Sequence, residues 1–136
     1  MTMLLDTNIV SLAMSADPGI MKELGKLEPG VAAISAVTYA EIRYGLRRGK
    51  SPAISRKEEL FDRLMQHLDV LSWDRDAAIA YAEERGACEA DGQALDQADL
   101  MILAHAASTR RVLVTRDAAL RRRDRKGPHS TRVIGW

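Results

Sequence analysis

Four acidic residues of this 136-residue chain stand beside apolar segments, where an isolated carboxylate is uncommon. Asp6 follows three apolar residues, Asp99 precedes five, Glu41 lies in a largely apolar stretch, and Asp117 comes shortly after another. Carboxylates in such positions are usually paired or bound to a metal, and four in one cleft would repel each other. A divalent cation would relieve that repulsion, and an all-oxygen ligand set suits Mg²⁺ or Mn²⁺ rather than zinc. Such a cluster can activate a water molecule and stabilise a phosphoryl transition state.

Each of these acids also has a purely structural interpretation. Asp6 and Asp117 each precede a predicted helix and could simply cap its backbone amides. Asp99, near the start of a helix, is favoured by the helix dipole, and Glu41 could be an ordinary exposed helical residue. The occurrence of all four together favours a site. Three neighbours could donate hydrogen bonds to its carboxylates, or could serve only in turns and caps: Thr7, Asn8 and Thr115.

Short apolar strands alternate with helices along the chain, which predicts βαβ units and a parallel sheet covered on both faces. Strands are predicted over residues 3–5, 31–34, 70–71, 112–115 and 131–134. Helices are predicted over residues 9–28 with a break near 17–19, and over 35–48, 51–67, 74–90, 98–109 and 117–123. In an open parallel sheet, functional residues gather at the carboxyl ends of the strands. All four acids can therefore reach one edge of the sheet.

The composition predicts one globular domain over residues 1–136 and excludes several classes of protein. A single Cys rules out a disulfide framework and a Cys-rich zinc site, and no apolar run approaches the ~18 residues of a membrane span. We expect a cytoplasmic protein with no membrane partner. The net charge of +1 conceals two basic segments, 43–57 and 110–132, on either side of the acidic segment 58–99. Basic clusters can attract phosphate backbones, although each could also be a solvated surface.

Four blocks of the sequence resemble those of the PIN-domain ribonucleases, specifically the toxins of VapBC-type toxin–antitoxin pairs. The blocks are residues 3–8, 35–46, 99–106 and 113–117. They have the family's order and spacing and extend over nearly the whole chain. Each block contains one of the four acids. Any single block is weak, but the four together are a specific resemblance.

This resemblance implies a three-layer α/β/α sandwich with a central parallel sheet, and an endoribonuclease that depends on Mg²⁺ or Mn²⁺. Asp6, Asp99 and Asp117 would hold the metal. Glu41 would bind the metal through water or orient the nucleophilic water. The resemblance also implies products with a 3′-hydroxyl and a 5′-phosphate, pairing as a homodimer, and inhibition by an antitoxin protein.

The chain departs from the family pattern after Asp117, where the family usually has an aromatic-containing stretch and this chain has a basic run. We expect three residues of that run to contact an RNA backbone, unless it is a solvated helix face or the antitoxin's docking surface: Arg121, Arg122 and Arg123. Other functions remain open, namely a housekeeping PIN nuclease without an antitoxin, or a nucleic-acid-binding module without activity. An aspartate-nucleophile phosphatase is disfavoured because its second aspartate would stand where Asn8 does. A phospho-accepting receiver domain would need a lysine after a later strand, where Arg116 stands.

Overall fold

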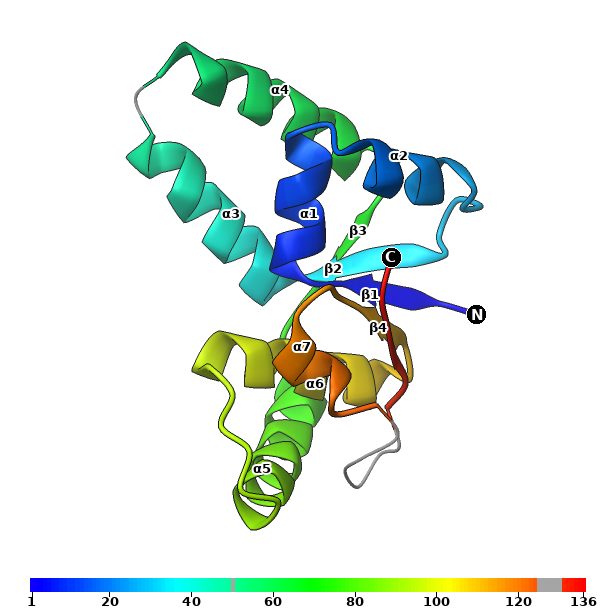
Figure 1. Cartoon of the computed structure of the whole chain (residues 1–136), viewed down its shortest axis with the longest axis vertical. Coiled ribbons are helices and arrows are strands. Elements are labelled where there is room, and N and C mark those ends of the chain that lie inside the picture. Colours follow the sequence, from blue (N-terminus) through cyan, green and yellow to red (C-terminus); the bar gives the residue numbers. More distant parts are fainter. Residues whose placement is uncertain (50, 125–130) are drawn as a thin grey trace.

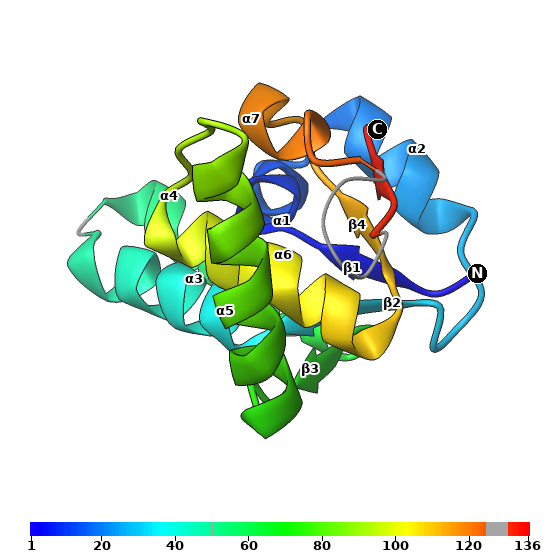
Figure 2. The same cartoon turned by 90° about the horizontal axis from the view of Figure 1, so that it is seen from below.

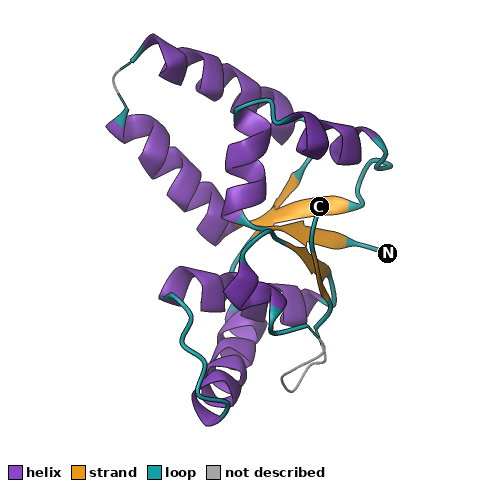
Figure 3. Ribbon diagram, in the orientation of Figure 1, coloured by secondary structure: helices purple, strands orange, loops and turns teal. Residues whose placement is uncertain are grey.

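The computed structural model describes residues 1–49, 51–124 and 131–136, and its centre is a parallel sheet of five strands (Figures 1 and 3). The strands are β1 (Met3–Leu5), β2 (Ala32–Ser35), β3 (Asp69–Leu71), β4 (Val112–Val114) and β5 (Val133–Ile134). Their order across the sheet is β3-β2-β1-β4-β5, and every neighbouring pair runs parallel. The predicted strands and the parallel sheet are confirmed.

Helices cover both faces of this sheet, so the three-layer α/β/α sandwich is confirmed. They are α1 (Thr7–Met14), α2 (Pro18–Gly25), α3 (Ala36–Arg48), α4 (Pro52–Met65), α5 (Arg75–Ala90), α6 (Gln97–Thr109) and α7 (Ala118–Arg121). Helices α1 to α4 lie on one side of the sheet and α5 to α7 on the other (Figure 1). Within the described ranges, no helix is both long and apolar enough to cross a membrane.

The alternation of side chains along each short strand divides the core into two parts. Met3 and Leu5 pack with residues of α1 to α4, whereas Leu4 between them packs on the opposite face with residues of α6 and α7. Leu113 and Val114 divide between the faces in the same way. A strand buried on both faces must be apolar at every position, which explains the continuous apolar runs of the sequence.

The segment between β1 and β2 forms two helices, and the first begins earlier than predicted, at Thr7 rather than at residue 9. The Asp6 carboxylate caps α1 by accepting a hydrogen bond of 2.9 Å from the backbone amide of Ile9. Asp17 caps α2 in the same manner, and Pro18 occupies its first turn, where a missing amide proton costs nothing. Helix α1 therefore begins immediately after β1, which fixes the direction in which Asp6 leaves the sheet.

Candidate active site at the carboxyl edge of the sheet

The four predicted acids come from elements that begin at the carboxyl edge of the sheet. Asp6 directly follows β1, and Asp117 follows β4 by three residues. Glu41 lies on α3, which begins at the end of β2, and Asp99 lies in the first turn of α6. Since parallel strands end at the same edge, the order of the strands places β1 and β4 side by side there.

Asp6 is the most deeply buried of these acids, with 3% of its surface exposed. Its Oδ1 atom accepts the Ile9 amide that caps α1, and its Oδ2 atom accepts a short hydrogen bond from the Thr115 hydroxyl. Burial raises the pKa of Asp6 above its ordinary value; the hydrogen bonds oppose this shift, while the charge of Asp117 adds to it. The fold thus fixes the position of the Asp6 carboxyl group while burial disfavours its ionised form.

Thr115 links two of the acids. Besides donating to Asp6, its hydroxyl oxygen accepts a hydrogen bond of 2.9 Å from the backbone amide of Asp117. The Asp117 carboxylate in turn accepts the amide of Leu120 at 2.9 Å and caps α7. The capping interpretation is therefore correct for both aspartates, but it engages only one carboxylate oxygen of each, and it orients the group rather than excluding a further role.

Glu41 is exposed and belongs to a second hydrogen-bonded group, at the place where α1 and α3 approach each other (Figure 1). Its Oε1 atom accepts a hydrogen bond of 2.6 Å from the Thr7 hydroxyl. The buried Thr38 hydroxyl lies 3.1 Å from the Thr7 oxygen. Because the Thr7 proton points to Glu41, Thr38 is the donor of that contact. Thr7 therefore donates a hydrogen bond to one of the four carboxylates, as predicted for it. Asn8 is exposed and reaches Asp6 through its backbone amide.

Asp99 shows that the four acids share one electrostatic environment. Its pKa is raised from 3.8 to about 6, first by burial and then by the charges of neighbouring carboxylates. Those neighbours include all three of the other predicted acids: Asp117, Asp6 and Glu41. Mutual repulsion of this kind is a signature of functional sites, although structural ion networks also produce it.

The donor chemistry of this group fits a hard divalent cation. All its side chains offer carboxylate or hydroxyl oxygen, which Mg²⁺ and Mn²⁺ prefer, and the raised pKa of Asp99 reflects a repulsion that a cation would relieve. Among residues 1–49, 51–124 and 131–136, however, no three acidic, histidine or cysteine side chains stand close enough to form a finished ligand cluster. The residues that could hold a cation are Asp6, Asp99 and Asp117.

His105, whose position on an apolar helix indicates a buried histidine with a hydrogen-bond partner, connects the elements of the site. The His105 Nδ1 atom lies 2.8 Å from the Ser35 Oγ atom, and Ser35 also caps α3 by accepting the Val37 amide at 3.1 Å. The ring also hydrogen-bonds to the backbone of Ser72, just beyond β3. Burial lowers the pKa of His105, so the ring is neutral and accepts the Ser35 proton. His105 therefore ties α6, which carries Asp99, to the start of α3, which carries Glu41.

The predicted RNA contact is contradicted for Arg123. Its side chain is fully buried, and its Nη1 atom donates to Asp91 Oδ2 at 2.7 Å and to Gln93 Oε1 at 2.8 Å. A guanidinium enclosed in this way joins the turn after α7 to the segment after α5 and cannot reach a phosphate. Arg121 and Arg122 are exposed, and the remainder of the basic run, from residue 125 onward, lies outside the described residues.

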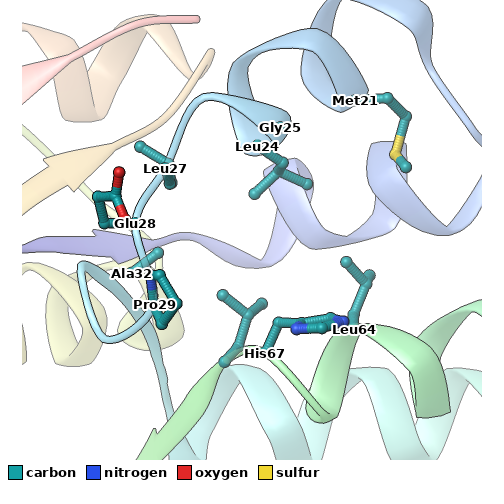
Figure 4. A pocket seen from close by; sticks show the side chains of 10 residues that line it. Met21, Leu24, Gly25, Leu27, Glu28, Pro29, Ala32, Leu64 and His67 are labelled. Atoms are coloured by element: carbon teal, nitrogen blue, oxygen red, sulfur yellow. The ribbon is translucent and has the colours of Figure 1, made fainter.

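Two hollows lie between α2, α3 and α4 and the rest of the fold. One, of about 370 Å³, is mostly apolar and lies between α2, the end of α4 and β2, with His67 and Glu28 among its lining residues (Figure 4). It contains none of the four acids. The other, of about 310 Å³, lies between α1, α3 and α4, and both Thr7 and Glu41 line it. The second hollow therefore opens onto the site.

Comparison with known proteins agrees with this geometry. The model of the PIN domain family matches residues 3–126. This chain belongs to the PIN domain family. The resemblance inferred from the four sequence blocks is thereby confirmed, and the carboxylates described above occupy the edge of a PIN fold.

Individual PIN proteins resemble the chain over most of its length. The tRNA(fMet)-specific endonuclease VapC of Shigella flexneri is 30% identical over 112 residues, which are 82% of this chain and 83% of that protein. The solved structure of DNA-bound VapBC from Salmonella typhimurium matches with 28% identity and a TM-score of 0.83, over 100% of this chain and 98% of that chain. The structure of VapBC2 from Rickettsia felis bound to a promoter DNA fragment matches with 24% identity and a TM-score of 0.84, over 100% of this chain and 99% of that chain. At this identity the match supports the fold alone.

Proposed function

We propose that this PIN protein is a cation-dependent endoribonuclease and the toxin of a type II toxin–antitoxin pair. The observation that carries the proposal is the convergence of four acids on one edge of a PIN fold, expressed in the raised pKa of Asp99. Relatives named as VapC endonucleases and ribonucleases, and solved VapBC complexes, support the assignment. A housekeeping PIN nuclease without an antitoxin is the alternative.

In this proposal, each acid has a part that follows from its surroundings. Asp6, Asp99 and Asp117 would hold Mg²⁺ or Mn²⁺, and Asp6 and Asp117 are held in position by the helices they cap. When bound, the cation would polarise the scissile phosphate and lower the pKa of a water molecule. Glu41 is exposed, and among the described residues it accepts a hydrogen bond from Thr7 at Oε1, so its Oε2 atom would orient that water. Attack of that water on phosphorus with the 3′-oxygen as leaving group, as the resemblance to the family implies, would yield a 5′-phosphate and a 3′-hydroxyl.

RNA is a polyanion and needs positive charge to approach an acidic site. Arg121 and Arg122, exposed at the end of α7, supply it next to the helix that Asp117 caps. With Arg123 buried, two contacts remain, and the salt slope for binding a single strand should be about −1.4, at ~0.7 per phosphate. We expect the Arg121→Ala, Arg122→Ala double variant to flatten this slope, as measured by RNA binding in Ca²⁺ at increasing salt. An unchanged slope would assign the basic run to another role.

An active ribonuclease in the cytoplasm must be restrained, and the hollow beside Glu41 suggests how. It is lined by Met14, Ile42 and Leu46 as well as by Glu41, which suits an amphipathic antitoxin segment. A basic side chain of that segment, such as an arginine, would enter among the four acids and form ion pairs with their carboxylates. If expression of the protein alone leaves growth unchanged, the toxin assignment weakens and the housekeeping alternative gains.

We also propose that the protein pairs as a homodimer. Val70 lies on the edge strand β3 with 42% of its surface exposed, and Ile79 on α5 is 53% exposed. An edge strand and exposed apolar side chains are each typical of an association surface. Sedimentation of wild type and of a Val70→Lys, Ile79→Lys variant would test this, with a monomeric wild type contradicting it.

The cleavage reaction is tested with purified protein and total RNA. Cleavage should occur with Mg²⁺ or Mn²⁺, stop in excess chelator and return when the cation is restored. The products should carry 5′-phosphates, which ligation to an RNA acceptor detects. Robust cleavage in chelator, or products with cyclic phosphates, would contradict the mechanism.

A further inference from the structure

The opposite edge of the sheet carries a small pocket that the nuclease function does not use. It lies where β4 and β5 begin, and its volume is about 150 Å³. Its lining residues are Ala106, Ala107, Arg110, Arg111, Val112, Thr131 and Arg132. Figure 2 shows the last turn of α6 leading into β4 on the side of the molecule where the chain begins. Because β4 is three residues long, this edge is separated from the acids by about 10 Å of strand.

Two short sequences build the pocket in the same way. Arg110 and Arg111 directly precede β4, and Thr131 and Arg132 directly precede β5. The two strands are neighbours, and the Leu113 amide donates to the Arg132 carbonyl at 2.9 Å. The amino ends of adjacent parallel strands thus bring three guanidinium groups and one hydroxyl to the same place.

The Thr131 hydroxyl is an independent sign that something binds here. Only 5% of Thr131 is exposed, and its buried Oγ1 atom has no hydrogen-bond partner among the residues that the structure describes. A buried hydroxyl without a partner costs folding free energy, and such groups in native proteins call for an explanation. A ligand with acceptor oxygens in the pocket would provide the missing bond.

The charge of the pocket favours an anion. The Nη1 atom of Arg111 donates to the carbonyls of Met3 and Val31, at 3.2 and 3.4 Å. The other two nitrogens of its guanidinium could contact an anion. Arg132 pairs with Asp124 at 3.2 Å with its side chain 48% exposed, and Arg110 is exposed. The carboxyl end of α6 opposes an anion with about half an elementary charge. Three guanidinium charges outweigh that half charge together with the charge of Asp124.

We propose that this pocket is a binding site for a phosphate-class oxyanion. Guanidinium groups match the oxygens of a phosphate in pairs, and the Thr131 hydroxyl would donate to another oxygen. The volume is about five times the ~30 Å³ that one liquid water molecule occupies, which leaves room for a tetrahedral anion. The anion is either free phosphate or a phosphate of an RNA backbone, and the site is independent of cleavage at the other edge.

The test follows inorganic phosphate binding by the NMR resonances of arginine Nε–H groups, in chelator and at constant ionic strength. Saturable shifts are expected for Arg110 and Arg132, but not for Arg63, which is exposed and ion-paired on α4. Thr131→Val should bind phosphate about 10- to 100-fold more weakly, since a hydrogen bond to a charged group is lost. In phosphate-free buffer the same variant should melt no lower than wild type, because the Thr131 hydroxyl has no partner to lose within the described part of the chain.

The source of the anion is decided by adding single-stranded RNA to the phosphate-loaded protein. Reversal of the shifts at Arg110 and Arg132 by RNA identifies a backbone phosphate, and persistence of the shifts identifies free phosphate. The absence of a saturable response, or an equal response in Thr131→Val, would overturn the proposal. Because chelator is present throughout, a protein without nuclease activity would still give a clear result here.

Discussion

Replacing Asp99 with asparagine should stabilise the cation-free protein at neutral pH. The pKa of Asp99 is raised from 3.8 to about 6, first by burial and then by the neighbouring acids. A shift of about 2 pKa units corresponds to ~3 kcal/mol by which ionised Asp99 destabilises the native state. Partial solvation reduces this to about 2 kcal/mol, and losing the favourable charge in the first turn of α6 removes up to ~1 kcal/mol of the gain. The expected net gain is about 1 kcal/mol.

Acidification should remove this gain. The native state takes up the Asp99 proton at a higher pH than the unfolded state does, so wild type gains stability relative to the variant as the pH falls from about 6 towards 4. The destabilisation by ionised Asp99 is about halved at pH 5 and falls to roughly a fifth at pH 4, where the native state is almost fully protonated and the unfolded state is partly protonated. The sign is opposite to that of a salt-bridged aspartate, whose stabilisation is lost in acid.

Urea unfolding in excess chelator at pH 7.5 and pH 5.0 measures both effects. Asp62→Asn, an exposed acid on α4, is the control and should change stability by less than ~0.5 kcal/mol at either pH. Adding Mg²⁺ should then stabilise wild type more than Asp99→Asn. The reasoning is refuted if Asp99→Asn is less stable than wild type at pH 7.5, or if the difference between them is the same at both pH values.

Three further variants test other parts of the account. Asp6→Ala and Asp74→Ala each remove a helix N-cap and should each lose about 1 kcal/mol of stability in chemical denaturation, but only Asp6→Ala should abolish RNA cleavage. Arg123→Ala should lose about 2–3 kcal/mol, because the hydrogen bonds of a buried guanidinium to Asp91 and Gln93 and its packing volume are lost. The exposed Arg122→Ala should change stability by less than ~0.5 kcal/mol, and equal effects would place Arg123 at the surface. His105→Gln should lower kcat at unchanged KM. Wild type should lose stability as the pH falls below about 6.5, because His105 takes up a proton more readily in the unfolded state than when buried. This loss should be smaller in His105→Gln, and an unaltered pH profile would contradict a buried neutral ring.

The sequence was sufficient to predict the sheet and the four acids, for a local reason. Strands such as β1 and β4 are buried on both faces, so their apolar runs are continuous, and the acids that follow them stand out. Parallel strands with covering helices then place those acids at one edge without further information.

The features that could not be predicted depend on contacts between distant segments. Arg123 belongs to a basic run, and its contacts with Asp91 and Gln93, 32 and 30 residues earlier, distinguish it from the exposed Arg122. The contact between Ser35 and His105 joins residues 70 apart in the chain. Thr38 gave a weak local signal, as a small hydroxyl on the apolar side of a helix, but its link to Glu41 through Thr7 needed the packing of α1 on α3.

The central claim is that the acids at the carboxyl edge of the sheet form the catalytic centre. The rate of RNA cleavage by Asp99→Asn in saturating Mg²⁺, measured beside wild type and Asp62→Asn, tests it most directly. The account predicts a fall of at least ~100-fold for Asp99→Asn, of the size that follows the loss of one group acting on the transition state, and no change for Asp62→Asn. A folded Asp99→Asn protein that cleaves RNA at the wild-type rate would contradict the claim.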